Sequence, residues 1–449
     1  MVKINTICRS SNDYVRETKY DITKVQRNSN PTLHQFQKAR EHQRALVATK
    51  LDKMFAKPFL GCLTGHSDSI SVITKCPNSL VKVISGTFDG ELRAWDISER
   101  KTLFSLNAHK QSVKGVSFSR DGQRFLSSGA DNIINLYDFQ DQLNNPDRDP
   151  LNVFYSKHVL GNVDHCWKGD NFVTSGGVVQ VWNYERSKPV QSFEWGIDTV
   201  LKVKYNPSQF NLIAGTGIDR SVVLYDTRGD TAIQKIFLSN KCQTICWNPT
   251  EPVNLIVGCD DGNCYSFDMR KMEQAKMIHK DHIGAVMDLD IAPTGRKFVT
   301  GSYDKTIRIF DVEKGKSEEI YHTKRMHQIF SVCWSMDNQF ILSGSDDMNI
   351  RIWKAKASQQ LGVVDKRLQN SLNYREALKD KFKYNQDINK VQRKQHLPKY
   401  IQNAKRRKQE QKQAKHRKQQ NMELNNVQQL SAPKPERTKK VEKVEITNN

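Results

Sequence analysis

The 449-residue chain lacks the long apolar run of a membrane helix, and it has only nine cysteines. No segment approaches roughly 18 consecutive apolar residues, so we expect no membrane contact through a spanning helix. The opening stretch, MVKINTICRSSNDY, has no apolar signal-peptide core, and we expect the chain to stay out of the secretory path. The cysteines show no paired framework, which predicts reduced thiols rather than disulfides.

Motifs of catalysis and of metal binding are also missing. The chain has no phosphate-binding glycine loop with lysine, no His-Glu-x-x-His and no nucleophile elbow. Gly215-Thr216-Gly217 resembles part of a dinucleotide loop, but it lies where Ser85-Gly86-Thr87 lies in another repeat. Two cysteine pairs within residues 242–264 have no accompanying histidine pair, which favours core packing over metal binding. The sequence therefore predicts a non-enzyme without cofactor, metal or small-molecule substrate.

What the chain does contain is a repeat of about 43 residues, marked by an aromatic side chain. The aromatic positions are Trp95, Tyr137, Trp182, Tyr225, Phe267, Phe310 and Trp353. Most of them are followed by Asp, and this period with an aromatic–Asp ending is typical of the WD40 propeller blade. The sequence predicts an all-β, seven-bladed WD40 β-propeller over residues 59–353.

An aspartate stands six residues before the aromatic in every repeat but the third, where Gly176 takes its place. These aspartates are Asp89, Asp131, Asp219, Asp261, Asp304 and Asp347. Aspartate favours tight turns because its side chain accepts hydrogen bonds from the local backbone. We therefore predict that they fix the turn between two strands of each blade.

Histidines open several repeats, and the first suggests two interpretations. Ser85, His66 and Asp89 have the composition of a catalytic triad. The same trio recurs in other repeats, however, and an active site does not need repeating. A buried hydrogen-bond relay is the favoured interpretation, because buried polar groups must be paired.

The propeller is flanked by segments of different composition. Phe59 to Leu63 is predicted to form a strand that joins the last blade and closes the ring. Residues 33–57 favour a short helix, and residues 141–150 an exposed loop. Residues 354–420 are predicted to be helical and basic, with an apolar stripe that includes Leu368, Leu378 and Phe382 docked on a partner or on the propeller. The part beyond Pro398 is expected to order only on binding, and residues 421–449 to be disordered.

Charge is concentrated outside the repeats. Residues 1–58 have a net charge of +7 and residues 354–449 of +16, whereas residues 59–353 have −2. Two basic arms on a near-neutral propeller predict an anionic partner, usually nucleic acid. The alternative is a solvated tail that only aids solubility.

The strongest basic clusters lie in the C-terminal arm. The candidate contact residues are Lys405, Arg406, Arg407, Lys408, Lys415, Arg417 and Lys418. Such clusters serve as nuclear import signals or as contacts to phosphates, and phosphate binding would be salt-dependent and largely blind to base sequence. Tyr374, Phe382, Tyr384 and Tyr400 either stack on unpaired bases or pack along helix faces.

The flanks of the repeats carry a family resemblance. YVRET (14–18), RALVATKLDKMFAKPF (44–59), LNYREALKDKFK (372–383) and HLPKYI (396–401) resemble the flanks of the Sof-type WD-repeat proteins. The resemblance reaches to about residue 420. It implies a nucleolar component of the small-subunit processome, associated with pre-ribosomal RNA, the box C/D small nucleolar ribonucleoprotein and other processome proteins. It also implies a location in the nucleus and nucleolus.

Metazoan members of the resembled family suggest an alternative function. They are described as substrate receptors of a cullin–RING ubiquitin ligase that bind its adaptor through an aromatic–Asp–x–Arg motif. Two blade ends here match that pattern, with Asp226 and Arg228 after Tyr225, and with Asp268 and Arg270 after Phe267. A guanidinium at a blade edge can make bidentate contacts to a partner. The other interpretation of both arginines is an ordinary exposed blade edge.

Overall fold

Two compact units make up the computed structural model, which describes residues 19, 32, 35–146, 148–194, 198–425 and 435–446. One unit comprises residues 59–355 and 396–449, and the other comprises residues 1–58 and 356–395. In the described part of the chain, no helix is long and apolar enough to cross a bilayer.

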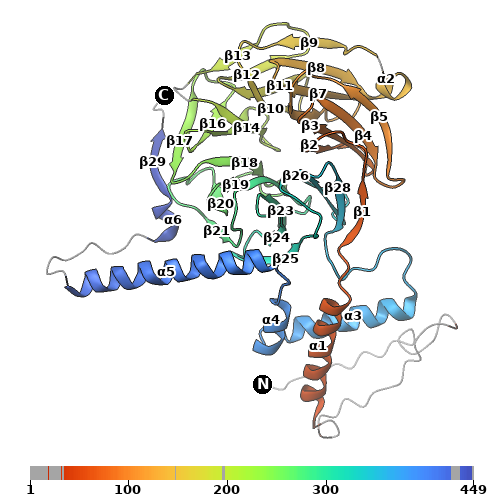
Figure 1. Ribbon diagram of the computed structural model, residues 1–449, viewed down its shortest axis with the longest axis vertical. Helices are drawn as coiled ribbons and strands as arrows, with labels where there is room; N and C mark the ends of the chain where they lie inside the picture. The colour runs from red at the N-terminus through yellow and green to blue at the C-terminus, as the bar shows by residue number, and fades with distance from the viewer. Residues whose placement is uncertain are drawn as a thin grey trace, which may run out of the picture. The chain divides into compact units, whose positions relative to one another are not determined.

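Seven antiparallel sheets form a ring in the first unit (Figure 1). Blade one contains β2 (Ile70–Lys75), β3 (Lys82–Thr87), β4 (Glu91–Asp96) and β5 (Lys101–Asn107). Blade two contains β6 (Val113–Phe118), β7 (Arg124–Gly129), β8 (Ile133–Asp138) and β9 (Asn152–Tyr155). Blade three contains β10 (Leu160–His165), β11 (Asn171–Gly176), β12 (Val179–Asn183) and β13 (Gln191–Phe193).

The remaining blades follow the same order. Blade four contains β14 (Val200–Tyr205), β15 (Leu212–Gly217), β16 (Ser221–Asp226) and β17 (Ala232–Leu238). Blade five contains β18 (Cys242–Trp247), β19 (Asn254–Cys259), β20 (Asn263–Asp268) and β21 (Met277–Lys280). Blade six contains β22 (Val286–Ile291), β23 (Lys297–Ser302), β24 (Ile307–Asp311) and β25 (Ser317–Tyr321). Blade seven contains β26 (Ile329–Trp334), β27 (Phe340–Ser345), β28 (Ile350–Lys354) and β1 (Phe59–Leu63).

The predicted seven-bladed propeller is thus confirmed, together with its closure. Strand β1 pairs antiparallel with β28, and Phe59 lies opposite Trp353. Leu63 then packs in one apolar cluster with Ile70 of blade one and Ile350 of blade seven. Closing the ring in this way leaves no blade without its outer strand.

The recurring aromatic lies on the third strand of every blade and is buried. Its exposed fraction is 0–4% in the seven blades. On a strand, neighbouring side chains point to opposite faces, so one large ring in each blade can fill the space against the adjacent sheet. In blade six, for example, the rings of Phe298 and Phe310 stack with their centroids 5.2 Å apart, and both belong to an apolar cluster with Ile256 of blade five.

Two local expectations about the repeats can be compared with the structure. Gly215 to Gly217 end strand β15, which confirms their interpretation as blade geometry. Residues 141–150 do not form only a loop, because α2 (Phe139–Asn144) extends into them. Asp138 caps this helix, because its side chain accepts a hydrogen bond from the backbone N–H of Gln140 at 2.9 Å. In the sequence, Asp138 was interpreted only as the aspartate that ends a repeat, so its role as an N-cap was missed.

Charged pairs connect the first strands of the blades, which contact one another around the axis. Lys75 of blade one pairs with Asp290 of blade six at 2.8 Å and donates to the Trp334 carbonyl of blade seven at 2.8 Å. Lys204 of blade four pairs with Asp164 of blade three at 2.7 Å. The Lys204 pair joins two neighbouring blades, whereas Lys75 links blade one to blade seven and to the non-adjacent blade six.

The second unit is built from three helices, α1 (Gln37–Met54), α3 (Lys366–Lys381) and α4 (Gln386–Gln392). Ala45 of α1 forms a small core with Leu378 and Ile388, and Leu46 and Phe382 pack against it. The part of the apolar stripe formed by Leu378 and Phe382 therefore has a partner within this unit, which the sequence analysis did not consider. It packs on the predicted helix of the N-terminal arm, which a local periodicity cannot reveal.

Three further elements belong to the propeller unit: α5 (Lys399–Asn425), α6 (Glu436–Lys439) and β29 (Val441–Ile446). The segment beyond Pro398 forms a 27-residue helix, and the expectation that it orders only on binding stays a prediction. The described residues within 421–449 have secondary structure, which differs from the expected disorder: residues 421–425 end α5, and residues 435–446 contain α6 and β29. The predicted domain boundaries otherwise stay a prediction.

Candidate nucleic-acid interface

The repeat histidines form relays inside the blades. His282 of blade six contacts Asp304 through Nδ1 at 3.0 Å and Thr300 Oγ1 through Nε2 at 2.7 Å. Burial lowers the pKa of His282 despite the nearby Asp304 carboxylate. Burial alone would raise the pKa of Asp304, but the His282 and Arg308 side chains and hydrogen bonds hold it well below its usual value. The relay is therefore a buried network that fixes the turn.

Blade one departs from the expected relay. His66 contacts Ser85 Oγ at 2.6 Å, but its Nδ1 meets Glu91 at 3.2 Å instead of Asp89. Asp89 is exposed, whereas Glu91 is buried, two residues further along the hairpin. Ser85 is fully buried and accepts the Trp95 indole N–H at 2.7 Å. The trio Ser85, His66 and Asp89 is thus not assembled as a triad.

Blade two keeps the expected arrangement, since His109 contacts Asp131 at 3.1 Å and Ser127 at 2.8 Å. In blade four, Asp219 pairs with Lys235 at 2.8 Å, and in blade seven Asp347 accepts from Arg351 at 2.9 Å. A buried cation thus takes the place of histidine there.

In blade five the turn aspartate has a long-range partner. Asp261 accepts the Tyr265 hydroxyl at 2.6 Å and the Lys440 ammonium at 3.1 Å. Lys440 directly precedes β29, so this turn holds the C-terminal segment. In blade three, Gly176 stands in place of the turn aspartate and is the last residue of β11. The indole N–H of Trp182 there donates to Thr174 Oγ1 at 3.0 Å.

The first turns of α5 lie against blades five and six. Tyr400 donates its hydroxyl to the Asp304 carbonyl at 2.5 Å, and Ile401 is 1% exposed. Lys405 pairs with Asp281 at 3.3 Å, and Lys408 donates to the Asp261 carbonyl at 3.4 Å. Burial and the nearby Lys412 charge lower the pKa of Lys408. Two of the seven candidate cations therefore help to hold the helix on the propeller.

The other five candidate cations are exposed on α5. We call this set the exposed row: Arg406, Arg407, Lys415, Arg417 and Lys418. Arg406 pairs within the helix with Glu410 at 3.1 Å. For the remaining four, the described residues provide no carboxylate partner. A cationic surface of this kind attracts phosphates.

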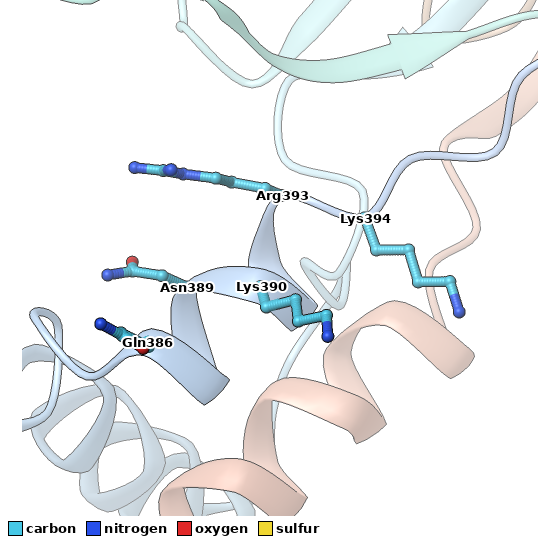
Figure 2. A pocket seen from close by; sticks show the side chains of 5 residues that line it. All are labelled: Gln386, Asn389, Lys390, Arg393 and Lys394. Atoms are coloured by element: carbon cyan, nitrogen blue, oxygen red, sulfur yellow. The ribbon is translucent and has the colours of Figure 1, made fainter.

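A second polar stripe lies on α4 and the turn after it, and the sequence analysis missed it. Figure 2 shows its side chains extending from α4 and from the turn that follows it. They line an open hollow of about 660 Å³. The lining residues are Gln386, Asn389, Lys390, Arg393 and Lys394. Their spacing of three and four places them on one helix face. That spacing is the signal in the sequence by which the stripe could have been found.

The four aromatic candidates have different surroundings. Phe382 packs edge-on against His42 at 5.7 Å, and Tyr400 anchors α5, so both are structural. Tyr374 accepts a hydrogen bond from Arg44 at 3.2 Å but is half exposed. Tyr384 is 90% exposed and is the aromatic ring among the four that is open for stacking.

The two blade ends that match the adaptor motif differ in geometry. Arg228 is exposed and pairs with Asp226 of its own turn, with its NH2 nitrogen at 2.9 Å. Those contacts raise the pKa of Arg228. Arg270 is also exposed, and it contacts Asp268 through its backbone N–H at 2.9 Å. Both guanidinium groups are accessible at the edges of adjacent blades four and five.

The cysteines of residues 242–264 pack in the core, as predicted. Cys242 and Cys259 lie opposite each other on β18 and β19 as free thiols, with their sulfur atoms 3.2 Å apart. Cys264 is buried between blades five and six. Burial raises the pKa of Cys246 to about 11, so it stays a neutral thiol.

A seven-bladed WD-repeat propeller with basic helices after its last blade defines the class of the molecule. A model described as the Sof1-like domain matches residues 355–441, and a model described as WD domain, G-beta repeat matches 57–96, 100–138, 274–311 and 318–354. The structure adds the blades between residues 139 and 273, where the repeat model finds no match.

Full-length relatives establish the family. DDB1- and CUL4-associated factor 13 of Danio rerio is 43% identical over 421 residues, which cover 94% of this chain and 95% of the relative. The Homo sapiens protein of that name is 40% identical, with 89% and 90% coverage. Protein SOF1 of Saccharomyces cerevisiae is 39% identical, with 90% and 87% coverage. The chain belongs to the family of Sof1-like WD-repeat proteins.

Proposed function

We propose that the chain is a non-catalytic scaffold of the nucleolar small-subunit processome, required for maturation of small-subunit ribosomal RNA. In this proposal the propeller binds processome proteins, and the basic helices bind pre-ribosomal RNA or the small nucleolar ribonucleoprotein. Family membership and the resemblance of the flanks support this assignment. The corresponding location is the nucleus and nucleolus.

The observation that carries the proposal is the exposed row on α5. Lys405 and Lys408 contact the propeller, whereas the five cations of the exposed row lie in solvent. A helix of 27 residues is about 40 Å long. Anchoring its first turns limits the conformational entropy that RNA binding would otherwise cost.

The polar stripe of α4 is a second candidate contact. Lys390, Arg393 and Lys394 place three cations around the hollow, and Gln386 and Asn389 add amide donors. Cations and amides are the groups that contact sugar–phosphate backbones without reading bases. The stripe therefore fits the sequence-blind binding proposed for α5.

Particle assembly in cells tests the proposal. We would replace Arg407, Lys415, Arg417 and Lys418 by Gln in the full chain and follow its sedimentation with pre-ribosomal particles. The expected result is a shift of most of the variant to the free fraction, with accumulation of unprocessed precursor RNA. The matched control replaces Lys101, Lys276 and Lys297, surface cations of the propeller that already pair with glutamates. Normal sedimentation of the α5 variant contradicts the proposal.

A second candidate function is that of substrate receptor in a cullin–RING ubiquitin ligase. Several relatives are named DDB1- and CUL4-associated factors, and two exposed arginines, Arg228 and Arg270, stand at the blade ends that match the adaptor motif. The test is a double variant, Arg228→Ala with Arg270→Ala. A receptor role predicts that the variant loses the ligase adaptor in a pull-down while particle assembly persists. Retention of adaptor by the variant rejects these two residues as its site.

A further inference from the structure

Blade four differs from the other blades in its outer edge. In the described part of the chain the other sheets have four strands, whereas blade four has a fifth, β29. Figure 1 shows β29, in blue, alongside β17, in green. The two strands pair antiparallel, with Val444 opposite Ile236 and Val441 opposite Leu238. The edge of β17 is thus covered by the C-terminal segment of the same chain.

A β-bulge lets two valines three residues apart face the same core. The register shifts between Phe237 and Leu238, so Glu442 lies outside the regular pairing. Because a bulge adds one residue, Val441 and Val444 both pack on the cluster that contains Ile236 and Leu238. Ile236 and Leu238 are 0% and 1% exposed with β29 in place.

The strand is held by backbone pairing, by its two valines and by ion pairs at its margin. No residue of β29 is buried, and the charged contacts at its margin are partly exposed. Glu442 lies 3.6 Å from Arg220, with both side chains about half exposed. Ser239 donates its backbone N–H to the Lys440 carbonyl at 3.1 Å. Backbone pairing can be supplied by any extended segment, and exposed ion pairs contribute little.

The β17 side of the contact defines what a segment must offer in order to pair with it. It offers a seven-residue edge, an apolar surface formed by Ile236 and Leu238, and a cation at Arg220. A bare edge of this kind invites another strand. Two aliphatic side chains on one face and a carboxylate near Arg220 are the complement that this edge requires.

We infer that the β17 edge is a strand-docking site for an extended segment of another polypeptide chain that carries two aliphatic side chains on one face and a carboxylate near Arg220. The chain's own β29 fills the site until such a partner displaces it. The site lies on the propeller, and its inference does not rest on RNA binding by α5. It adds a protein-binding surface to the outer edge of blade four.

A peptide-binding experiment tests this inference. The probe is a fluorescent peptide with the sequence of residues 435–446, PERTKKVEKVEI. Binding is measured to the full chain, to a chain that ends at residue 434, and to a full chain carrying Val441→Asp with Val444→Asp. The last variant releases the strand without truncation and serves if the shortened chain folds poorly. A probe with the same two substitutions is the control.

The expected result is that both altered chains bind the probe at least about tenfold more tightly than the full chain does, because cis occupancy competes with it. The control probe binds at least about tenfold more weakly than the original probe. Hydrogen exchange of the β17 amides should rise in the altered chains and fall again when the probe is added.

Two outcomes overturn the inference. Equal binding to all chains, or no binding to either altered chain, excludes a strand site at β17. Dimerisation of the full chain that is lost on truncation also excludes the inferred partner, because a second copy would then be the occupant.

Discussion

The cations inside the propeller and the cations on α5 are the same residue types in opposite situations. Arg351 and Lys235 are 6% and 4% exposed and pair with Asp347 and Asp219. Arg407 and Lys418 on α5 are exposed, and no carboxylate partner occurs for them among the described residues. A buried charge is tolerated when a counter-charge lies beside it, whereas an exposed charge retains its water and ions until a phosphate displaces them.

This difference separates the two tasks of the molecule. Substitutions inside the propeller should change its stability, because they leave a buried partner uncompensated. Substitutions on the exposed row should change binding and leave the fold intact. Lys405 and Lys408 lie between these limits, since they belong to α5 but contact the propeller.

The largest effect is expected at the turn aspartate of blade six. Asp304→Ala removes the partner of His282 and the nearby counter-charge of Arg308, which should lower the free energy of unfolding by about 3–5 kcal/mol. Urea unfolding measures the loss. The matched control is Asp89→Ala, the exposed equivalent in blade one, with an expected change within about 0.5 kcal/mol. Equal losses at the two positions would show that the relay does not stabilise the blade.

Buried histidine makes the propeller sensitive to acid. Burial lowers the pKa of His279 to about 4 from its usual 6.5. Between these values the unfolded chain binds a proton that the folded chain does not, so stability falls as the pH falls. This one group contributes about 1.4 kcal/mol per pH unit in that window.

The test compares urea midpoints of the wild type and His279→Gln from about pH 7 to about pH 4.5. As the pH falls, the free energy of unfolding of the variant should decrease less steeply than that of the wild type. The difference in slope should correspond to about one proton bound on unfolding. The control is His416→Gln on the exposed surface of α5, which alters no buried group. An unchanged slope for His279→Gln would contradict the assigned cause.

The exposed row should act on RNA affinity alone. Replacing Arg407, Lys415, Arg417 and Lys418 by Gln should reduce the slope of log affinity against log salt for single-stranded RNA by about 3. Filter binding or anisotropy at several salt concentrations measures it. The control on the same helix is Lys405→Gln with Lys408→Gln, for which we expect the slope of log affinity against log salt to change by less than about 1. Equal changes for both variants would remove the distinction between the two faces of α5.

The smallest effect concerns the anchoring of α5. Tyr400→Phe removes the hydrogen bond from the Tyr400 hydroxyl to the Asp304 carbonyl. The docking of α5 on the propeller should weaken by about 1 kcal/mol, which raises the equilibrium constant for local opening of the helix about fivefold. Hydrogen exchange of the α5 amides measures this opening. Tyr384→Phe, a highly exposed position, is the control. No difference between the two variants would show that Tyr400 does not hold the helix.

The propeller could be predicted from the sequence because its signals repeat. One aromatic residue is weak evidence, but seven at one period define seven blades and even the strand that closes the ring. The sequence could not predict that His66 contacts Glu91 and not Asp89, because both carboxylates lie on the same hairpin. Only the side-chain geometry decides between them.

The arms were harder to predict for physical reasons. The contact of Leu378 with Ala45 joins segments more than 300 residues apart, and no local periodicity encodes such a partner. Val441 and Val444 lack the alternation of a strand, and the bulge at Glu442 restores it only once the strand is paired. The candidate cations were found from composition, but the separation of Lys405 and Lys408 from the exposed row depends on where α5 docks.

The most direct test of the central claim is crosslinking of the tagged full chain to RNA in cells, with both the RNA reads and the crosslinked peptides identified. The account predicts reads on pre-ribosomal or small nucleolar RNA and crosslinked peptides from residues 406–418. It also predicts that replacing the four unpaired cations of the exposed row by Gln removes those peptides. Crosslinks that persist in this variant, or reads confined to other RNA classes, would contradict it.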